Sequence, residues 1–359
     1  MAQTQTLLKS GQELRSIQIL RGVAAMLVVC RHVSLEFDDR SLFGEMPFGA
    51  IGVDIFFPIS GMVIYLTAPS LIWKQFLIRR ISRVAPMYWL ATITKVIAVT
   101  LIPAGVAAYG FDAWHLLASL FFIPATDAGG RPFPPIALGW TLNFEMYFYL
   151  LSTVMLAVFP SRFGLALSAA ICAGVAAGIA LSQHNSLLLL LLHPISLEFA
   201  MGIAIASLWT RGVRTPVWLN VLLVGVALLV IAHFPNVEMF DPLRPLKWGL
   251  PSALIIWSVV MLEGTTLVSR FPAGKILGDA SYSIYIIHPL VLPVLAPIVI
   301  RLIEPTDGGV FFLLFASAVL CGLVVHVLVE RRINRFFRSR FVRAGRSRNV
   351  RREAHGEVG

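Results

Sequence analysis

The sequence predicts an all-α, polytopic membrane protein with about ten transmembrane helices and both termini in the cytoplasm. Of its 359 residues, 57% are hydrophobic and only 13% are charged, and the mean hydropathy is +0.81. Soluble domains carry roughly 25% charged residues. Apolar runs of membrane-spanning length recur along the chain, and lysine and arginine gather in alternate connecting segments. These three observations predict the fold class.

Each expected span is an apolar run of about 20 residues, the length that crosses a bilayer as a helix. A further apolar piece at 113–124 is too short to span and predicts an interfacial or re-entrant helix. The first 14 residues are polar, so we expect no cleaved signal peptide. In chain order, the ten runs are 16–35, 49–68, 84–103, 138–160, 163–181, 186–209, 216–234, 246–263, 281–303 and 310–330.

Positive charge orients these helices, because cytoplasmic loops carry an excess of lysine and arginine. With the N-terminus inside, 21 of the 29 lysine and arginine residues fall on the cytoplasmic side, five fall outside and three lie within spans. The acidic loop 36–45 falls outside, in agreement. We therefore divide the chain into a transmembrane domain, residues 1–335, and a basic cytoplasmic tail, residues 336–359.

The basic tail and the cysteines exclude some functions. Ten arginines lie between Arg331 and Arg352, directly after the last span. We expect them to bind anionic membrane lipids, and we expect no nucleic-acid partner because no basic-aromatic module is visible. The three cysteines lie in apolar segments without metal-ligand spacing, so no metal site is predicted.

His32 and Asp54 are the first candidates for chemistry, because ionisable groups inside a bilayer are costly and need a reason. A short external loop joins the first two helices, so both side chains reach a similar depth near the outer surface. A carboxylate can fix the tautomer of an imidazole, which suits a general base that acts on a hydroxyl group. The alternative is a hydrated histidine and a hydrated aspartate at helix ends.

Three arginines form the second group of candidates. Arg21 lies eleven residues before His32, about three turns away on nearly the same helix face, so the two mark a stripe that could line a passage. Arg80 and Arg83 are three residues apart and share a face of the third helix, where they could bind phosphates bidentately. The alternatives are snorkelling for Arg21 and positive-inside anchoring for the other two.

Glu145 lies about two turns inside the fourth span. A carboxylate at this depth needs hydrogen-bond donors, which Trp140, Tyr147 and Tyr149 could supply. The sequence therefore favours a functional role for Glu145.

The ninth run carries a polar stripe. Ser281, Tyr285 and His288 lie on roughly one face, and Pro289 could free backbone carbonyls there. A histidine that bonds a neighbouring helix is the alternative. We predict that Tyr285, His288 and Ser60 of the second span bind substrate.

Several stretches resemble the acyltransferase 3 family of membrane O-acyltransferases. The matching pieces come in the family order and extend from the first span to the ninth: "SIQILRGVAAMLVVCRH", "FGAIGVDIFFPISGMVIY", "FLIRRISRVAPMYWL", "WTLNFEMYFYLL" and "SYSIYIIHPLV". The amino-acid sequences of these stretches are most similar to those of bacterial exopolysaccharide acetyltransferases. Pro58 stands where the family more usually has an aliphatic residue, so we expect a bend of the second helix near Ser60.

The resemblance implies an acyl-CoA donor, usually acetyl-CoA as a co-substrate, with no permanently bound cofactor. It also implies a carbohydrate acceptor, polymeric or lipid-linked, and the inner membrane of a bacterium. The family's functional positions fall on Arg21, His32, Asp54 and Glu145 in the active site, and on Arg80 and Arg83 on the CoA side.

On this basis we expect His32, oriented by Asp54, to take the proton from a sugar hydroxyl as its oxygen attacks the thioester. A relay through a covalent acyl-histidine is the alternative route. Buried ionisable residues in ten spans would also suit a transporter or a flippase of glycan intermediates, or a non-catalytic scaffold. Release of free CoA would distinguish the enzyme from these.

Overall fold

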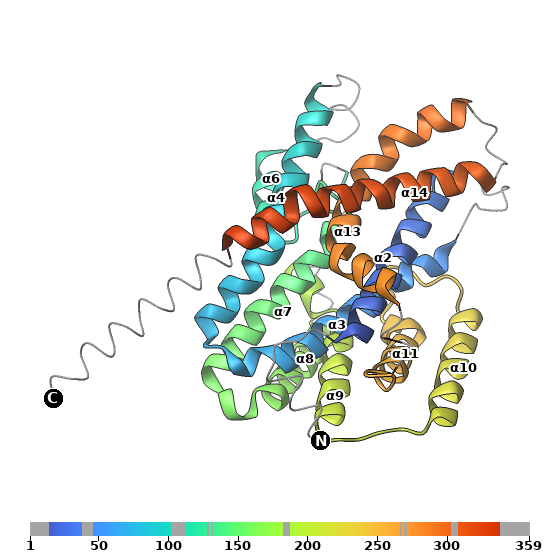
Figure 1. Cartoon of the computed structure of the whole chain (residues 1–359). Coiled ribbons are helices and arrows are strands. Elements are labelled where there is room, and N and C mark those ends of the chain that lie inside the picture. The colour runs from blue at the N-terminus through green and yellow to red at the C-terminus, as the bar shows by residue number, and fades with distance from the viewer. Residues whose placement is uncertain are drawn as a thin grey trace, which may run out of the picture.

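The computed structural model describes residues 14–37, 46–101, 112–127, 129–130, 132–181, 187–265, 268, 271–302 and 308–337. Within these ranges the chain is helical and contains no β-strand, which confirms the all-α prediction. The α-helices (Figure 1) are α2 (Arg15–Ser34), α3 (Ile51–Thr67), α4 (Trp73–Leu101), α6 (Ala113–Leu120), α7 (Gly139–Val158), α8 (Phe163–Ala180), α9 (Leu197–Thr210), α10 (Val217–His233), α11 (Leu250–Val260), α13 (Pro272–Leu302) and α14 (Gly308–Val325).

Shorter helical turns lengthen several of these helices. Two are π-helical: η7 (Pro245–Gly249) leads into α11, and η8 (His326–Glu330) continues α14. The 3-10 turns are η1 (Pro47–Ala50), η2 (Ala68–Ser70), η3 (Pro160–Arg162), η5 (Leu187–Leu192) and η6 (Pro194–Ser196).

Seven helical segments in the described part of the chain are long and apolar enough to cross a membrane. They are Arg15–Ser34, Pro47–Ser70, Trp73–Leu101, Gly139–Val158, Pro160–Ala180, Pro272–Leu302 and Gly308–Phe337. Three shorter apolar helices, Pro194–Thr210, Val217–His233 and Pro245–Val260, occupy the remaining expected runs. A helical, multi-pass membrane protein is therefore confirmed, whereas the count of ten and the orientation stay predictions.

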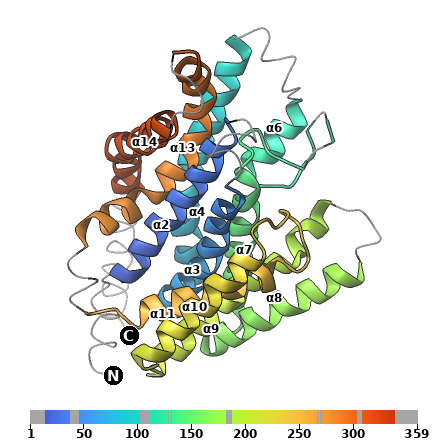
Figure 2. The ribbon, with the colours of Figure 1, turned by 90° about the vertical axis from the view of Figure 1, so that its right-hand side faces the viewer.

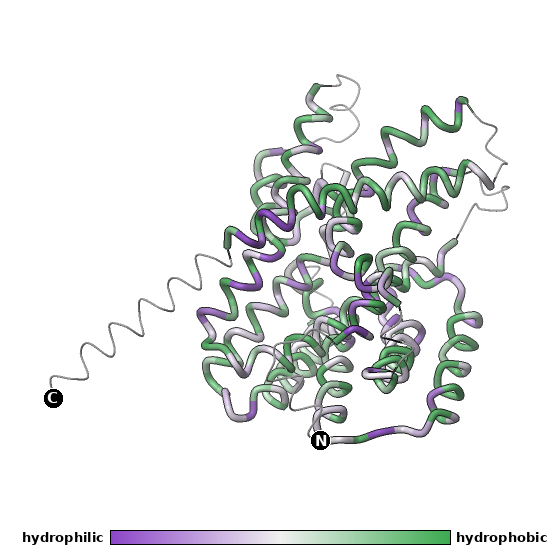
Figure 3. The backbone as a smooth tube through the Cα atoms, viewed as in Figure 1, coloured by the Kyte–Doolittle hydropathy of each residue, from purple (hydrophilic) through white to green (hydrophobic). Residues whose placement is uncertain are grey.

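The outer surface of the bundle is apolar (Figure 3). Large hydrophobic side chains are solvent-exposed on the peripheral helices; Leu165 of α8, Leu229 of α10 and Phe312 of α14 are 70%, 71% and 63% exposed. Exposed apolar surface of this extent is unfavourable in water. It is the surface that lipid chains cover in a membrane protein.

The short apolar piece predicted at 113–124 forms α6. Asp112 caps its N-terminus by accepting a hydrogen bond from the N–H of His115. The Ser119 hydroxyl lies 2.6 Å from the Tyr88 hydroxyl of α4. With eight residues, α6 is too short to span a bilayer and packs beside α4.

The helices α2, α3 and α13 occupy the centre of the molecule (Figures 1 and 2). α2 packs against both α13 and α3, and α3 crosses α9. At this crossing Gly61 faces the carbonyl of Phe199, and Gly202 faces the carbonyl of Pro58, where a Cβ atom at either glycine would collide. α3 continues as one helix through Pro58 to Thr67. The bend that the sequence predicted near Ser60 therefore does not break the helix.

Candidate active site

A cavity of about 130 Å³ lies between the central helices and the pair α4 and α7. Its lining brings together six of the nine residues that the sequence singles out. They are Arg21 of α2, Ser60 of α3, Arg80 and Arg83 of α4, Glu145 of α7 and Tyr285 of α13. His32, Asp54 and His288 do not line it. Motifs that are far apart in the sequence thus meet in one cavity.

The acidic side of the cavity is centred on Glu145. One carboxylate oxygen, Oε1, accepts hydrogen bonds from the Ser60 hydroxyl and from the Tyr149 hydroxyl, both at 2.5 Å. Tyr149 lies one turn after Glu145 on α7, on the same face. Of the three aromatic residues that could serve Glu145, Tyr149 is the one that bonds it. The bond from Ser60 joins α3 to α7.

The basic side of the cavity carries three guanidinium groups. The Nη2 atom of Arg80 donates to the Thr67 hydroxyl at 2.6 Å, and its guanidinium lies 5.9 Å from the centre of the Tyr149 ring. Arg83, about one turn further along α4, makes no hydrogen bond or ion pair with any residue that the structure describes. Arg21 adds a third positive charge from α2. Three cations against the single carboxylate of Glu145 make this cavity suited to an anionic ligand.

Tyr285 forms one wall of the cavity. Its hydroxyl lies 2.8 Å from the Thr141 hydroxyl and donates to the carbonyl of Leu138 at 3.3 Å. Phe56 packs edge-on against its ring, with centroids 5.8 Å apart. Tyr285 is therefore held by contacts on two sides, and its ring leads from the cavity to His288, 6.2 Å away between centroids.

His32 and His288 form a pair beside this wall. Their ring centroids are 5.0 Å apart, and the rings are tilted by 59°. The Nδ1 atom of His32 lies 2.8 Å from the carbonyl oxygen of Val28, and that of His288 lies 2.9 Å from the carbonyl oxygen of Ile284. A carbonyl oxygen only accepts hydrogen bonds, so each Nδ1 carries the hydrogen and each Nε2 keeps a lone pair.

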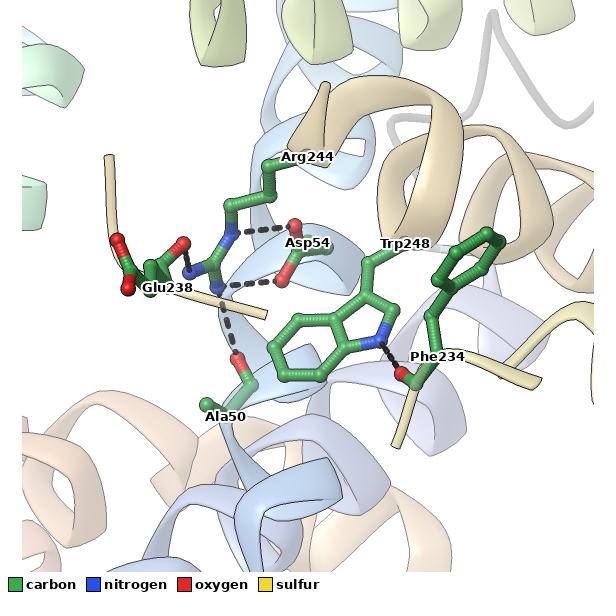
Figure 4. A network of polar contacts seen from close by, with 6 residues as sticks. All are labelled: Ala50, Asp54, Phe234, Glu238, Arg244 and Trp248. Atoms are coloured by element: carbon green, nitrogen blue, oxygen red, sulfur yellow. Dashed lines mark hydrogen bonds and ion pairs between the residues drawn. The ribbon is translucent and has the colours of Figure 1, made fainter. Parts of the chain in front are cut away.

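Asp54 does not take the place that the sequence suggested for it beside His32. Its carboxylate receives two hydrogen bonds from Arg244, Nε to Oδ1 at 2.8 Å and Nη2 to Oδ2 at 2.7 Å (Figure 4). Both side chains are buried, with 0% and 2% exposure. A buried carboxylate needs a cation, and the planar guanidinium fits both of its oxygens. His288, not Asp54, is the ionisable residue whose ring contacts His32.

Further contacts hold Arg244 in place (Figure 4). It also donates to the carbonyls of Ala50 and Glu238, at 3.3 and 3.5 Å, and its guanidinium lies 5.0 Å from the centre of the Trp248 ring. The indole N–H of Trp248 donates in turn to the carbonyl of Phe234 at 2.9 Å. The segment between α10 and η7 is therefore attached to the N-terminal end of α3.

A partly buried ion pair reinforces the same segment. Lys247 donates to Asp241 at 2.5 Å, and the backbone N–H of Leu243 donates to the same carboxylate at 2.8 Å. Partial burial acts to raise the pKa of Asp241, but these hydrogen bonds outweigh it and hold the pKa below its ordinary value.

Aromatic side chains fill the space between the cavity and this segment. Phe57 lines the cavity, and its ring lies 6.4 Å from that of Trp140. Trp140 in turn contacts Phe240, with centroids 5.6 Å apart. The carbonyl of Phe240 lies 3.0 Å from Nε2 of His193, so the end of the aromatic series is anchored.

Sequence reasoning missed Arg244, Thr141 and Tyr282 as members of the site or its surroundings. Arg244 was counted among the outer-loop charges, although an arginine directly before an apolar run on the same side as Asp54 is a signal that could have identified it. Thr141 and Tyr282 line the cavity but carry no signal of their own, because hydroxyl groups are common in helix contacts. Most of the proposed basic tail, from residue 338 onwards, lies outside the described residues.

Comparison with known proteins finds a matching family and a similar protein, but no matching solved structure. The family described as "Acyltransferase domain" matches residues 14–329. The exopolysaccharide production protein ExoZ of Rhizobium meliloti (strain 1021) is 34% identical over 311 residues, which cover 83% of this chain and 93% of that protein. No solved structure matches.

Proposed function

This chain belongs to the acyltransferase 3 family, and from that premise we propose that it moves an acyl group, in the first instance acetyl, from acyl-CoA to a hydroxyl group of an exopolysaccharide or its lipid-linked precursor. Membership makes the protein an acyltransferase. The similarity to a protein of exopolysaccharide production over most of both chains supports the class of acceptor. The donor and the acceptor hydroxyl belong to the proposal.

The observation that carries the proposal is the state of His32 beside a cationic cavity. The bond from Nδ1 to the carbonyl of Val28 leaves Nε2 with its lone pair, which is the form of histidine that accepts a proton. Among the described residues Nε2 has no hydrogen-bond partner. A general base for an alcohol needs this tautomer.

In the proposed reaction, Arg80 and Arg83 bind phosphate groups of acyl-CoA at the cytoplasmic mouth of the cavity. The cavity cannot enclose a whole CoA molecule, so the pantetheine arm enters it and carries the thioester past Arg21 towards Tyr285. Glu145 either holds the sugar or supports the contact between α3 and α7 through Ser60.

The acceptor hydroxyl gives its proton to Nε2 of His32 as its oxygen attacks the carbonyl carbon of the thioester. A carbon–oxygen bond forms, the carbon–sulfur bond breaks, and the leaving thiolate of CoA takes the proton back from His32. The proton that leaves the acceptor hydroxyl ends on the thiol of CoA, so His32 returns to its neutral form and no further reactant is needed. Arg21 stabilises the negative charge that develops on the thioester oxygen.

The arrangement in the membrane follows from the same proposal. All ten apolar helices span the inner membrane of a bacterium, and both termini lie in the cytoplasm, where acyl-CoA is available. The polymer is modified at the opposite side. Lysine and arginine in the loops support this orientation.

The test measures ester-linked acetate on the exported polysaccharide of the host by proton NMR. Deletion of the gene should remove the acetate, the wild-type gene should restore it, and His32→Ala should not, although the variant protein inserts at the normal level. His233→Ala, which changes an exposed histidine at the end of α10, is the matched control and should restore acetate fully. Full acetate with His32→Ala would refute the role of His32. Unchanged acetate with altered polymer export in the deletion strain would favour a transporter.

A further inference from the structure

His288 presents a buried atom that the described structure leaves without a partner. Its side chain is 0% exposed, its Nδ1 is bonded to Ile284, and its Nε2 has no hydrogen-bond partner among the described residues. Buried polar atoms in folded proteins are nearly always paired, and an unpaired acceptor is destabilising. An orphaned atom beside an active site therefore calls for an explanation.

The position of the His288 ring suggests at which step of the proposed reaction its Nε2 atom acts as an acceptor. Nδ1 points back along α13 to Ile284, so the Nε2 edge points away from the backbone of its own helix. The rings in contact with His288 are those of Tyr285 and His32. Tyr285 already pairs its hydroxyl with Thr141. His32 is the neighbour whose charge changes in the proposed reaction.

Neutral His32 cannot donate a hydrogen bond from its Nε2 to Nε2 of His288. In the tautomer that the structure fixes, both Nε2 atoms are acceptors. Once His32 has taken a proton it is an imidazolium, with a hydrogen on each ring nitrogen. Val28 continues to accept from Nδ1. The ring of His288, whose centroid is 5.0 Å from that of His32, then lies against a positively charged ring.

We propose that His288 is a positioning residue that stabilises the protonated form of His32 through the lone pair on its own Nε2. This inference rests on the proposed function, because it concerns the state that His32 reaches after it takes the proton from the acceptor. His288 then fills the role that the sequence suggested for Asp54. Its contribution appears after proton transfer and is absent from the ground state, so it raises kcat and leaves substrate binding unchanged.

The stripe on α13 supports this division of roles. Ser281 and Tyr285 line the cavity, whereas His288, about one turn further along, does not. Neither His288 nor His32 lines the cavity, and the two rings lie beside each other just behind Tyr285. Pro289 follows it and removes one backbone N–H from the helix, so that a carbonyl in this turn loses its usual partner while Ile284 receives the imidazole.

The experiment uses the full-length protein in membrane vesicles, with acetyl-CoA as donor and chemically deacetylated polysaccharide of the host as acceptor. Release of free CoA gives kcat and the KM for acetyl-CoA. Two variants of similar size are compared: glutamine in His288→Gln places an oxygen acceptor close to the position of Nε2, whereas asparagine in His288→Asn reaches only the position of Nδ1. His233→Gln is the control, with no expected change.

We expect His288→Asn to lower kcat by about 10- to 100-fold with KM for acetyl-CoA changed less than about twofold. His288→Gln should recover most of this loss. Equal kcat in the two variants, a wild-type kcat in His288→Asn, or a loss confined to KM would each overturn the proposal, since a packing role would not distinguish the two amides.

The outcome also separates this inference from the function on which it rests. An inactive His32→Ala with a fully active His288→Asn would leave the acyltransferase proposal intact and refute only the role of His288. Wild-type protein that releases no CoA with this acceptor would overturn both. The thermal unfolding midpoint of each variant is measured alongside, and a variant that unfolds early is compared at a temperature where it is intact.

Discussion

Arg244 takes the place of water around the carboxylate of Asp54. Its guanidinium supplies two short hydrogen bonds to the carboxylate and reaches two backbone carbonyls, so most of its donors are used. Two charges buried together are expensive to desolvate, and removing one of them leaves the other without compensation. The pair is therefore a structural tie between α3 and the segment before η7, whatever part it plays in catalysis.

The buried pair gives a prediction for stability. Arg244→Leu should lower the free energy of unfolding by about 3–5 kcal/mol, because it leaves the Asp54 carboxylate buried and unpaired. The double variant Arg244→Leu with Asp54→Leu should lose clearly less than this, since neither charge of the pair remains. Thermal unfolding in detergent measures both. A double variant as unstable as the sum of the two single variants would show that the side chains do not interact.

Single residues show what sequence reasoning can and cannot supply about the site. Glu145 could be identified because a charge inside a membrane span needs a reason, and Arg80 and Arg83 because their spacing places them on one helix face. The partners were harder to identify. Asp54 was assigned to His32 because their helices are adjacent in the chain, but its partner Arg244 lies 190 positions later, and one sequence does not say which distant helices touch.

At the scale of helices, hydropathy predicts where the bilayer is crossed better than where a helix begins. α4 begins at Trp73 and α13 at Pro272, whereas the apolar runs were placed from residues 84 and 281. The additional turns carry basic and polar residues, which lie outside the predicted apolar runs but continue the same hydrogen-bonded helices. The arginines of α4 lie on these additional turns and so reach the mouth of the cavity.

The crossing of α3 and α9 depends on two glycines. Gly61 and Gly202 each allow a backbone carbonyl of the other helix to approach where a Cβ atom would stand. Small residues at helix contacts permit such close packing in membrane proteins. Because Ser60 is next to Gly61, this crossing also sets the distance between Ser60 and Glu145.

Replacing either glycine tests this crossing. Gly61→Ala and Gly202→Ala should each lower the free energy of unfolding by about 1–3 kcal/mol, since the helices must separate to admit a methyl group. Gly225→Ala on α10, where a Cβ meets no atom within 4 Å, is the control and should be neutral or slightly stabilising. Unfolding midpoints in detergent measure all three. A loss in the control equal to that in the other two would contradict the packing argument.

The described part of the chain is a bundle of largely apolar helices (Figure 3), with large apolar side chains exposed at its periphery and a smaller set of polar side chains buried among apolar ones in its interior. The composition and the length of the apolar runs were sufficient to predict a helical bundle, because a run of about 20 apolar residues crosses lipid as a helix that satisfies its own backbone groups. Three apolar helices of the described part, Pro194–Thr210, Val217–His233 and Pro245–Val260, have at most 17 residues. This length is at or below the lower limit for a helix that crosses a bilayer.

Chemical labelling tests the proposed orientation. In a background that lacks Cys30, Cys172 and Cys321, a single cysteine at Asn236 should react with a membrane-impermeant maleimide in intact cells. A cysteine at Ser161 should react only after lysis, because the positive-inside rule places it in the cytoplasm. Labelling of Ser161→Cys in intact cells would reverse the orientation and place the arginines of the cavity at the wrong face for cytoplasmic acyl-CoA.

The aromatic series of Phe57, Trp140 and Phe240 has a consequence for the cell as a whole. An enzyme that joins a cytoplasmic donor to an acceptor on the other face risks becoming a leak for protons and small ions. These rings replace water along the line from the cavity to the segment at Phe240, and an ion would have to shed its hydration shell to pass them. In the proposed function, the acyl group would thus change sides while the electrical insulation of the membrane, and the energy stored across it, is preserved.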